Sequence, residues 1–146
     1  MIEPAAGLTR GVLAILLDAY TEEEGTDADG KVKKRVLLKL NPKIAPIKAA
    51  ILPLTKKDGM PDLGRSILKK FLNEGIAAKY DEQQSIGKRY ARHDEVGTPD
   101  CLTVDHQSLE DNTVTVRDRD TTNQERISIE KAIEVVKDRL KTSDRN

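Results

Sequence analysis

The spacing of apolar side chains changes near residue 48 of this chain. From there onward, short apolar runs alternate with stretches in which apolar side chains recur every three or four residues. Short apolar runs are typical of buried strands, and the longer spacing is typical of helices that pack one face on a core. The order strand, helix, strand, helix, strand, strand, helix predicts an α/β sandwich with a mostly parallel sheet and one antiparallel strand.

Turn-forming residues separate these predicted elements. Gly75 and Gly97 end the first two helices, and residues 110–112 are predicted to form a turn that joins the last two strands in a hairpin. The predicted elements are strands at 49–54, 76–80, 101–104 and 113–117, and helices at 63–72, 85–96 and 129–140.

The first 47 residues follow a different pattern. Residues 8–20 form a predicted helix that is apolar on nearly every side, and such a helix needs burial on all its faces. A domain of this size seldom surrounds its own first helix, so we expect this helix to pack against something outside the chain. An acidic loop at 21–31, a basic strand at 35–40 and a proline-containing segment then mark a boundary between domains.

Charge is segregated in this boundary region although the total is neutral. The chain has 146 residues, with 25 Lys and Arg and 25 Asp and Glu. Six acids and no base lie within 18–30, whereas seven bases and no acid lie within 31–48. Because binding responds to the local field, neutrality does not exclude a nucleic-acid partner. The alternative is an acidic loop and a basic strand that are simply solvated.

Composition excludes several classes of protein. No apolar run approaches the roughly 18 residues that a transmembrane helix needs. Cys101 is the only cysteine, so an internal disulfide or a multi-cysteine zinc cluster is excluded. The two histidines, His93 and His106, show no metal-ligand spacing. Cys101 and His106 are conceivable as a nucleophile pair, but a buried thiol with an unrelated surface histidine is the preferred interpretation.

Two groups of charged residues are candidate binding sites. In the first, Lys88 and Arg92 share a helix face, with Arg89 beside them. In α/β folds, ligands bind at the carboxyl ends of strands, and an anionic ligand such as RNA suits cations and a helix N-terminus at this edge. A solvated helix with an ion pair between Arg92 and Glu95 is the alternative.

The second group, residues 117–120, follows a predicted strand. Alternation places Arg117 and Arg119 on one face, and it would point Asp118 and Asp120 toward the core if the strand continued. Buried carboxylates need partners, so either the strand ends here or these acids cap, pair or accept hydrogen bonds. Asp can accept from the cytosine N4 amine and Arg can read guanine, so base recognition is one interpretation. A structural network of arginines and aspartates is the other.

Four stretches, in the right order, resemble glycyl-tRNA synthetase of the homodimeric class II type. Residues 3–10 with the apolar helix resemble class II motif 3, and residues 41–48 resemble the junction between the catalytic core and the C-terminal domain. Residues 86–99 and 111–121 resemble the anticodon-binding domain of that family. The resemblance covers essentially the whole chain.

The resemblance implies an α/β, three-layer fold of the anticodon-binding-domain type, with a mixed five-stranded sheet and three helices, preceded by an N-terminal helix. It divides the chain into a remnant of the catalytic core (1–30), a basic strand and linker (31–47), an anticodon-binding domain (48–141) and a tail (142–146). It also implies a cytoplasmic parent enzyme that is a homodimer without a membrane partner.

The resemblance gives only part of an ATP site. Glu3, Gly7 and Arg10 belong to the motif 3 match, in which an arginine contacts the ATP phosphates. Ala5 and Thr9 stand where the family usually has Ser and Asp. Nothing resembles motifs 1 and 2 or the glycine pocket. We therefore expect no complete catalytic site, no metal and no cofactor for this chain, whereas the parent enzyme uses ATP and Mg²⁺.

The predicted function is recognition of the anticodon loop of tRNA-Gly by the C-terminal portion of a glycine–tRNA ligase, with a catalytic domain or chain as partner. The alternative is an accessory nucleic-acid- or protein-binding module, as in the processivity subunit of the mitochondrial DNA polymerase; an enzyme with a small ligand in the crevice ranks last. Glycine anticodons end in two cytosines, and carboxylates can accept from their N4 amines. The predicted tRNA-binding residues are Lys88, Arg89, Arg92, Asp94, Glu95, Arg117, Asp118, Arg119 and Asp120.

Overall fold

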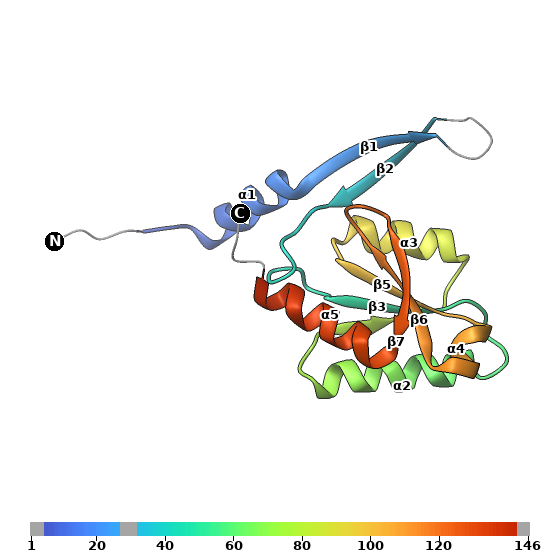
Figure 1. Ribbon diagram of the computed structural model, residues 1–146. Helices are drawn as coiled ribbons and strands as arrows, with labels where there is room; N and C mark the ends of the chain where they lie inside the picture. Colours follow the sequence, from blue (N-terminus) through green and yellow to red (C-terminus); the bar gives the residue numbers. More distant parts are fainter. Residues whose placement is uncertain (1–4, 27–31, 143–146) are drawn as a thin grey trace.

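A mixed five-stranded sheet forms the centre of the molecule (Figure 1). The structure, a computed structural model, describes residues 5–26 and 32–142. Strand β3 pairs in parallel with β4 and β5, and β6 pairs antiparallel with β5 and β7. In sheet order, the strands are β4 (Ala78–Tyr80), β3 (Ala49–Pro53), β5 (Asp100–Val104), β6 (Thr113–Asp118) and β7 (Gln124–Ser128).

Helices cover both faces of the sheet and complete three layers (Figure 1). Helices α2 (Met60–Asn73) and α5 (Ile129–Thr142) cover one face, and α3 (Ile86–Glu95) covers the other. The alternation of side chains along β3 explains this arrangement, because Ile51 belongs to the larger core while Ala50 and Leu52 pack toward α3. The predicted α/β fold, with a mixed five-stranded sheet between layers of helices, is confirmed.

Two elements of this domain differ from the apolar pattern. Strand β7 is the fifth strand that the resemblance implies, but the apolar pattern did not locate it, because only Ile127 of its five residues is buried. A short helix, α4 (His106–Asp111), stands where a tight turn was expected. Asp105 starts it with a reciprocal cap, in which the backbone N–H of Ser108 donates to Asp105 and that of Asp105 donates to Ser108. The antiparallel pairing of β5 and β6 is nevertheless confirmed.

The N-terminal segment adds a helix and a two-stranded hairpin. Helix α1 (Leu8–Ala19) leads into β1 (Tyr20–Thr26), which pairs antiparallel with β2 (Val32–Leu38). The expectation of an acidic loop at 21–31 is therefore wrong for its first six residues, which are strand. The physical reason is the pairing of opposite charges, because Glu23 stands opposite Arg35 and their side chains form an ion pair of 2.9 Å.

Helix α1 exposes most of its apolar surface. Its only buried residue is Ala19, and Leu8 and Leu17 are 84% and 69% exposed. An apolar groove of about 610 Å³ lies between α1, the end of β2 and the last turn of α3. This agrees with the expectation that the described residues do not surround this helix. No helix in the described ranges is long and apolar enough to cross a membrane.

Candidate functional site

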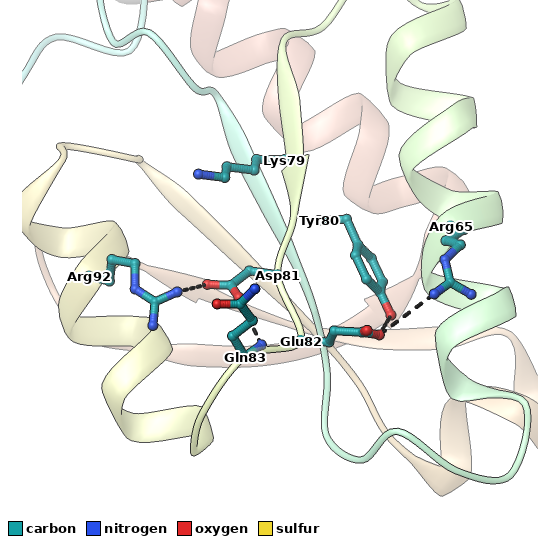
Figure 2. A pocket seen from close by; sticks show the side chains of 7 residues that line it. All are labelled: Arg65, Lys79, Tyr80, Asp81, Glu82, Gln83 and Arg92. Atoms are coloured by element: carbon teal, nitrogen blue, oxygen red, sulfur yellow. Dashed lines mark hydrogen bonds and ion pairs between the residues drawn. The ribbon is translucent and has the colours of Figure 1, made fainter.

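A polar pocket of about 410 Å³ lies at the carboxyl end of β4 (Figure 2). It is formed where β4 passes into the loop before α3, with one wall from α2. Ligands of α/β proteins bind at this edge of the sheet, so the pocket is the candidate site. The lining residues are Arg65, Lys79, Tyr80, Asp81, Glu82, Gln83 and Arg92.

One side of the pocket is built around Tyr80. Its hydroxyl donates to Oε2 of Glu82 at 2.6 Å, and the guanidinium of Arg65 lies 5.3 Å from the centre of its ring (Figure 2). Burial and the Glu82 carboxylate raise the pKa of Tyr80 to about 12, so the hydroxyl remains a donor. A methyl group on Gly64 would lie 2.9 Å from the ring, so glycine permits this close approach of α2.

The other side of the pocket is built around Asp81. Its Oδ2 accepts from Nη1 of Arg92 at 2.7 Å, and its Oδ1 accepts from the backbone N–H of Gln83 at 2.9 Å. Arg92 also donates to Gln84 at 3.1 Å. The pocket therefore holds a carboxylate whose charge is already compensated and an arginine that remains about one-third exposed.

Arg89, a predicted RNA contact, is buried and binds the backbone. Its Nη1 donates to the carbonyl oxygens of Pro53 and Asp81 at 2.6 and 3.2 Å. Pro53 is the last residue of β3 and Asp81 is the first residue after β4, so Arg89 joins the carboxyl ends of the two strands. Lys88, the preceding residue, is exposed and belongs to the solvent-facing side of α3.

Asp94 and Arg117 form a buried ion pair on the same face of the sheet. Two nitrogens of Arg117 donate to the two carboxylate oxygens of Asp94 at 2.9 and 3.1 Å, and the guanidinium lies 4.7 Å from the centre of the Tyr90 ring. Arg35 of the hairpin adds a third hydrogen bond to Asp94 at 3.0 Å. The carboxylate of Asp94 is thus occupied, as the structural-network alternative states.

Arg119 and Asp118 hold the turn between β6 and β7. Arg119 is buried and donates to the carbonyl oxygens of Leu40 and Gly97, and it pairs with Asp120. Asp118 accepts from the backbone N–H groups of residues 120 and 121, and it also accepts from Arg139 of α5 at 2.5 Å. As expected from alternation, Asp118 points to the valine side of β6 and finds partners there. Asp120 is half-exposed because β6 ends at Asp118, which is the alternative in which the strand stops within this group.

The predicted site residues therefore separate into buried and exposed sets. Lys88 and Glu95 are exposed and Arg92 is partly exposed, while Asp120 is half-exposed beside Arg119. Sequence patterns provided no distinct signal for Tyr80, Glu82 or Gln83 beyond their place at the end of a predicted strand, and none for Arg65, which lies within a predicted helix. Whether any of these residues contacts RNA stays a prediction. The buried ones among the predicted residues are Arg89, Asp94, Arg117 and Arg119.

The remaining candidates concern other chemistry. Gly7 and Arg10 are exposed at the start of α1, and Glu3 lies outside the described residues. Cys101 is buried, and burial raises the pKa of its thiol to about 12, so it does not act as a nucleophile at neutral pH. In the described part of the chain, no three His, Cys, Asp or Glu side chains converge to hold a metal ion.

Two solved structures of aminoacyl-tRNA synthetases contain a domain with this fold. The chain superposes on the RNA binding domain of threonyl-tRNA synthetase from Cryptosporidium parvum, with a TM-score of 0.63 and 22% identity. The match covers 68% of this chain and 25% of that chain. The chain also superposes on prolyl-tRNA synthetase of that organism, with a TM-score of 0.65 and 18% identity, covering 82% and 31%. These similarities show the fold. The chain belongs to the anticodon binding domain family, whose model matches residues 48–139.

Curated relatives identify the branch of this family. A glycine–tRNA ligase of Rhodopirellula baltica is 49% identical over 98% of this chain and 26% of its own length. A glycine–tRNA ligase of Borrelia hermsii is 53% identical over 88% of this chain and 28% of its own length. The chain thus spans less than a third of the relatives it matches. The resemblance to the C-terminal portion of a glycyl-tRNA synthetase is confirmed.

Proposed function

We propose that this chain binds the anticodon loop of a glycine-accepting tRNA, as the C-terminal portion of a glycine–tRNA ligase. The single observation that carries the proposal is the 49% identity to a glycine–tRNA ligase over 98% of the chain. The pocket at the carboxyl end of β4 supports it, because exposed cations from two helices surround a polar cavity there. Cations bind the phosphate backbone, whereas polar groups in the cavity can recognise bases.

In this proposal, different side chains bind the phosphates and the bases of the anticodon loop. Lys88 and Arg92 bind phosphate oxygens from α3, and Arg65 offers a planar cation on which a base can stack. Glu82 accepts from the N4 amine of an anticodon cytosine, since its Oε2 is held by Tyr80 and its other oxygen has no donor in the described ranges. The buried Arg89 and Arg117 position these groups without touching RNA.

The catalytic portion of the ligase is the partner for α1. The uncovered apolar surface of α1 and its groove support this, because the described residues do not bury them. ATP and Mg²⁺ belong to that portion. Arg10 is exposed in the first turn of α1, and Glu3 lies outside the described residues, so the described residues do not by themselves fit an ATP site. The parent enzyme is a cytoplasmic homodimer in this proposal.

A titration with RNA tests the proposal. The purified chain is titrated at fixed physiological salt with a glycine tRNA and with transcripts in which either anticodon cytosine is changed to uracil. Uracil offers an acceptor where cytosine offers its N4 amine, so we expect each change to weaken binding by about fivefold or more. Equal affinity for all transcripts would instead favour an accessory nucleic-acid-binding module, and no binding would overturn the proposal.

A further inference from the structure

Asp81 is shared by two basic side chains that follow each other on α3. Its Oδ2 lies 2.7 Å from Nη1 of Arg92 and 3.6 Å from Nε2 of His93. Arg92 is 36% exposed, whereas the side chains of His93 and Asp81 are 2% and 6% exposed. The partly exposed Arg92 and the buried His93 therefore compete for one buried carboxylate, that of Asp81.

His93 has one ring nitrogen, next to Asp81, that makes no hydrogen bond to the described residues. Its Nδ1 lies 3.3 Å from the hydroxyl of Thr98, and its buried Nε2 has no hydrogen-bond partner among the residues that the structure describes. Burial lowers the pKa of His93 below its usual 6.5, so the ring is neutral at neutral pH. The ring can take a proton at Nε2 once the charge of Asp81 is no longer compensated by Arg92.

We propose that Arg92 and His93 exchange on Asp81 when an RNA phosphate binds at α3, so that RNA binding takes up a proton. This inference rests on the proposed function. A phosphate offers Arg92 two parallel charge-assisted hydrogen bonds in place of the single one to Asp81. The buried carboxylate then needs a new partner, and His93 binds a proton from solvent at Nε2 and pairs with it.

The charges that face His93 determine the direction of the effect. Lys79 on β4 and Arg92 disfavour a protonated ring, whereas Asp81 and Asp94 favour it. Withdrawal of Arg92 removes one of the two cations and leaves Asp81 unpaired, and both changes raise the pKa of His93. RNA affinity should therefore increase as the pH falls from about 7.5 to about 5.5, by at most about tenfold per pH unit.

The exchange can be tested first without RNA. In the variant Arg92→Met, the pKa of His93 followed by its ring NMR signals should rise by about one unit or more. Lys88→Met is the matched control, since Lys88 is exposed on the same helix and does not contact Asp81. The signals of the two histidines are distinguished with His106→Gln. An unchanged pKa of His93 in Arg92→Met would overturn the exchange.

The proton uptake is tested with an in vitro transcribed glycine tRNA. Calorimetric titrations at pH 6.5 in two buffers with different ionisation enthalpies should give different heats, with an uptake of up to about one proton. His93→Gln should bind RNA normally at pH 7.5 but lose both the buffer dependence and the pH dependence. Equal heats and a pH-independent affinity in the unaltered chain would show that Arg92 stays on Asp81, and would overturn the inference. Absence of RNA binding at every pH would instead overturn the proposed function, and the experiment on the free protein would still decide the exchange.

Discussion

Nη1 of Arg119 donates a hydrogen bond of 3.0 Å to the carbonyl oxygen of Leu40, across 79 residues of sequence. In return, Arg35 of the hairpin donates to the carbonyl oxygen of Arg119. Leu37 and Leu40 are buried beside these contacts. The hairpin and the five-stranded domain are thus joined by reciprocal hydrogen bonds as well as by apolar packing, which holds them in one orientation.

Replacing Arg119 should destabilise this junction strongly. The variant Arg119→Met leaves the carbonyls of Leu40 and Gly97 without their donor, so we expect the free energy of unfolding in urea to fall by about 3 kcal/mol. Asp120→Asn is the control, because it retains both carbonyl contacts and Asp120 is half-exposed. It should cost less than about 1 kcal/mol. Equal losses in the two variants would contradict the role assigned to the carbonyl contacts.

Two glycines with left-handed backbones offer a matched comparison. Gly97 has a φ of +80°, and a methyl group there would lie 2.8 Å from Leu40 and 3.0 Å from the carbonyl oxygen of Leu38. Gly75 has a φ of +71°, with nothing within 4 Å. Gly75→Ala should therefore cost about 1 kcal/mol from the backbone alone, and Gly97→Ala about 2 kcal/mol more from the clash. Similar midpoints in thermal unfolding would contradict the close approach of the hairpin to α3.

The buried Asp100 should make stability depend on pH. Burial raises its pKa to about 6 despite Arg139, whose Nη1 lies 2.9 Å away. A raised carboxyl pKa means that the folded state binds the proton more tightly than the unfolded state. The cost of ionising Asp100 is therefore absent below about pH 4, develops as the pH rises to about 6, and persists above it.

The variant Asp100→Asn removes this cost. We expect its free energy of unfolding to exceed that of the unaltered chain by up to about 3 kcal/mol at pH 7.5, and to match it near pH 3.5. Arg139 keeps Asp118 as a partner, at 2.5 Å, so no charge is stranded. Urea denaturation at a series of pH values checks this. A difference that does not vary with pH would refute the assignment.

Lys88 and Arg92 should determine the salt dependence of RNA binding. Removing one cation that binds a phosphate makes the slope of log affinity against log salt shallower by about 1, so Lys88→Ala should weaken and flatten the binding. Lys88→Ala is the cleaner variant, because Arg92 also compensates Asp81. Lys131→Ala on α5 is the matched control, an exposed lysine on the opposite layer. A slope unchanged by Lys88→Ala would exclude Lys88 as a phosphate-binding residue.

Periodicity predicted the layers of the domain because it reports which face of each element is buried. It missed β7, because one apolar residue among five gives no alternating pattern. It also missed the strand at Tyr20–Thr26, because that strand is rich in acidic residues and is stabilised by the opposite charges of β2 rather than by apolar packing. The charge pairs between β1 and β2 join residues that are apart in the sequence, so only the structure reveals them.

Site residues were harder to predict, because a charged side chain in a sequence looks the same whether it is buried or exposed. Arg117 and Asp94 stand 23 residues apart, and Arg35 and Asp94 stand 59 apart. Neither spacing reveals an ion pair. Tyr80 and Glu82 were overlooked because their contact depends on the loop that follows β4 and on the approach of α2.

The inward-facing Arg89 has a consequence for variation in this family. It fixes the loops after β3 and β4 through carbonyl oxygens, which every amino-acid sequence supplies at those positions. The shape of this edge of the sheet is thus independent of the charges displayed on it. Lysines and acids on that surface can be exchanged by mutation, or redesigned for another anticodon, while the scaffold beneath them stays the same.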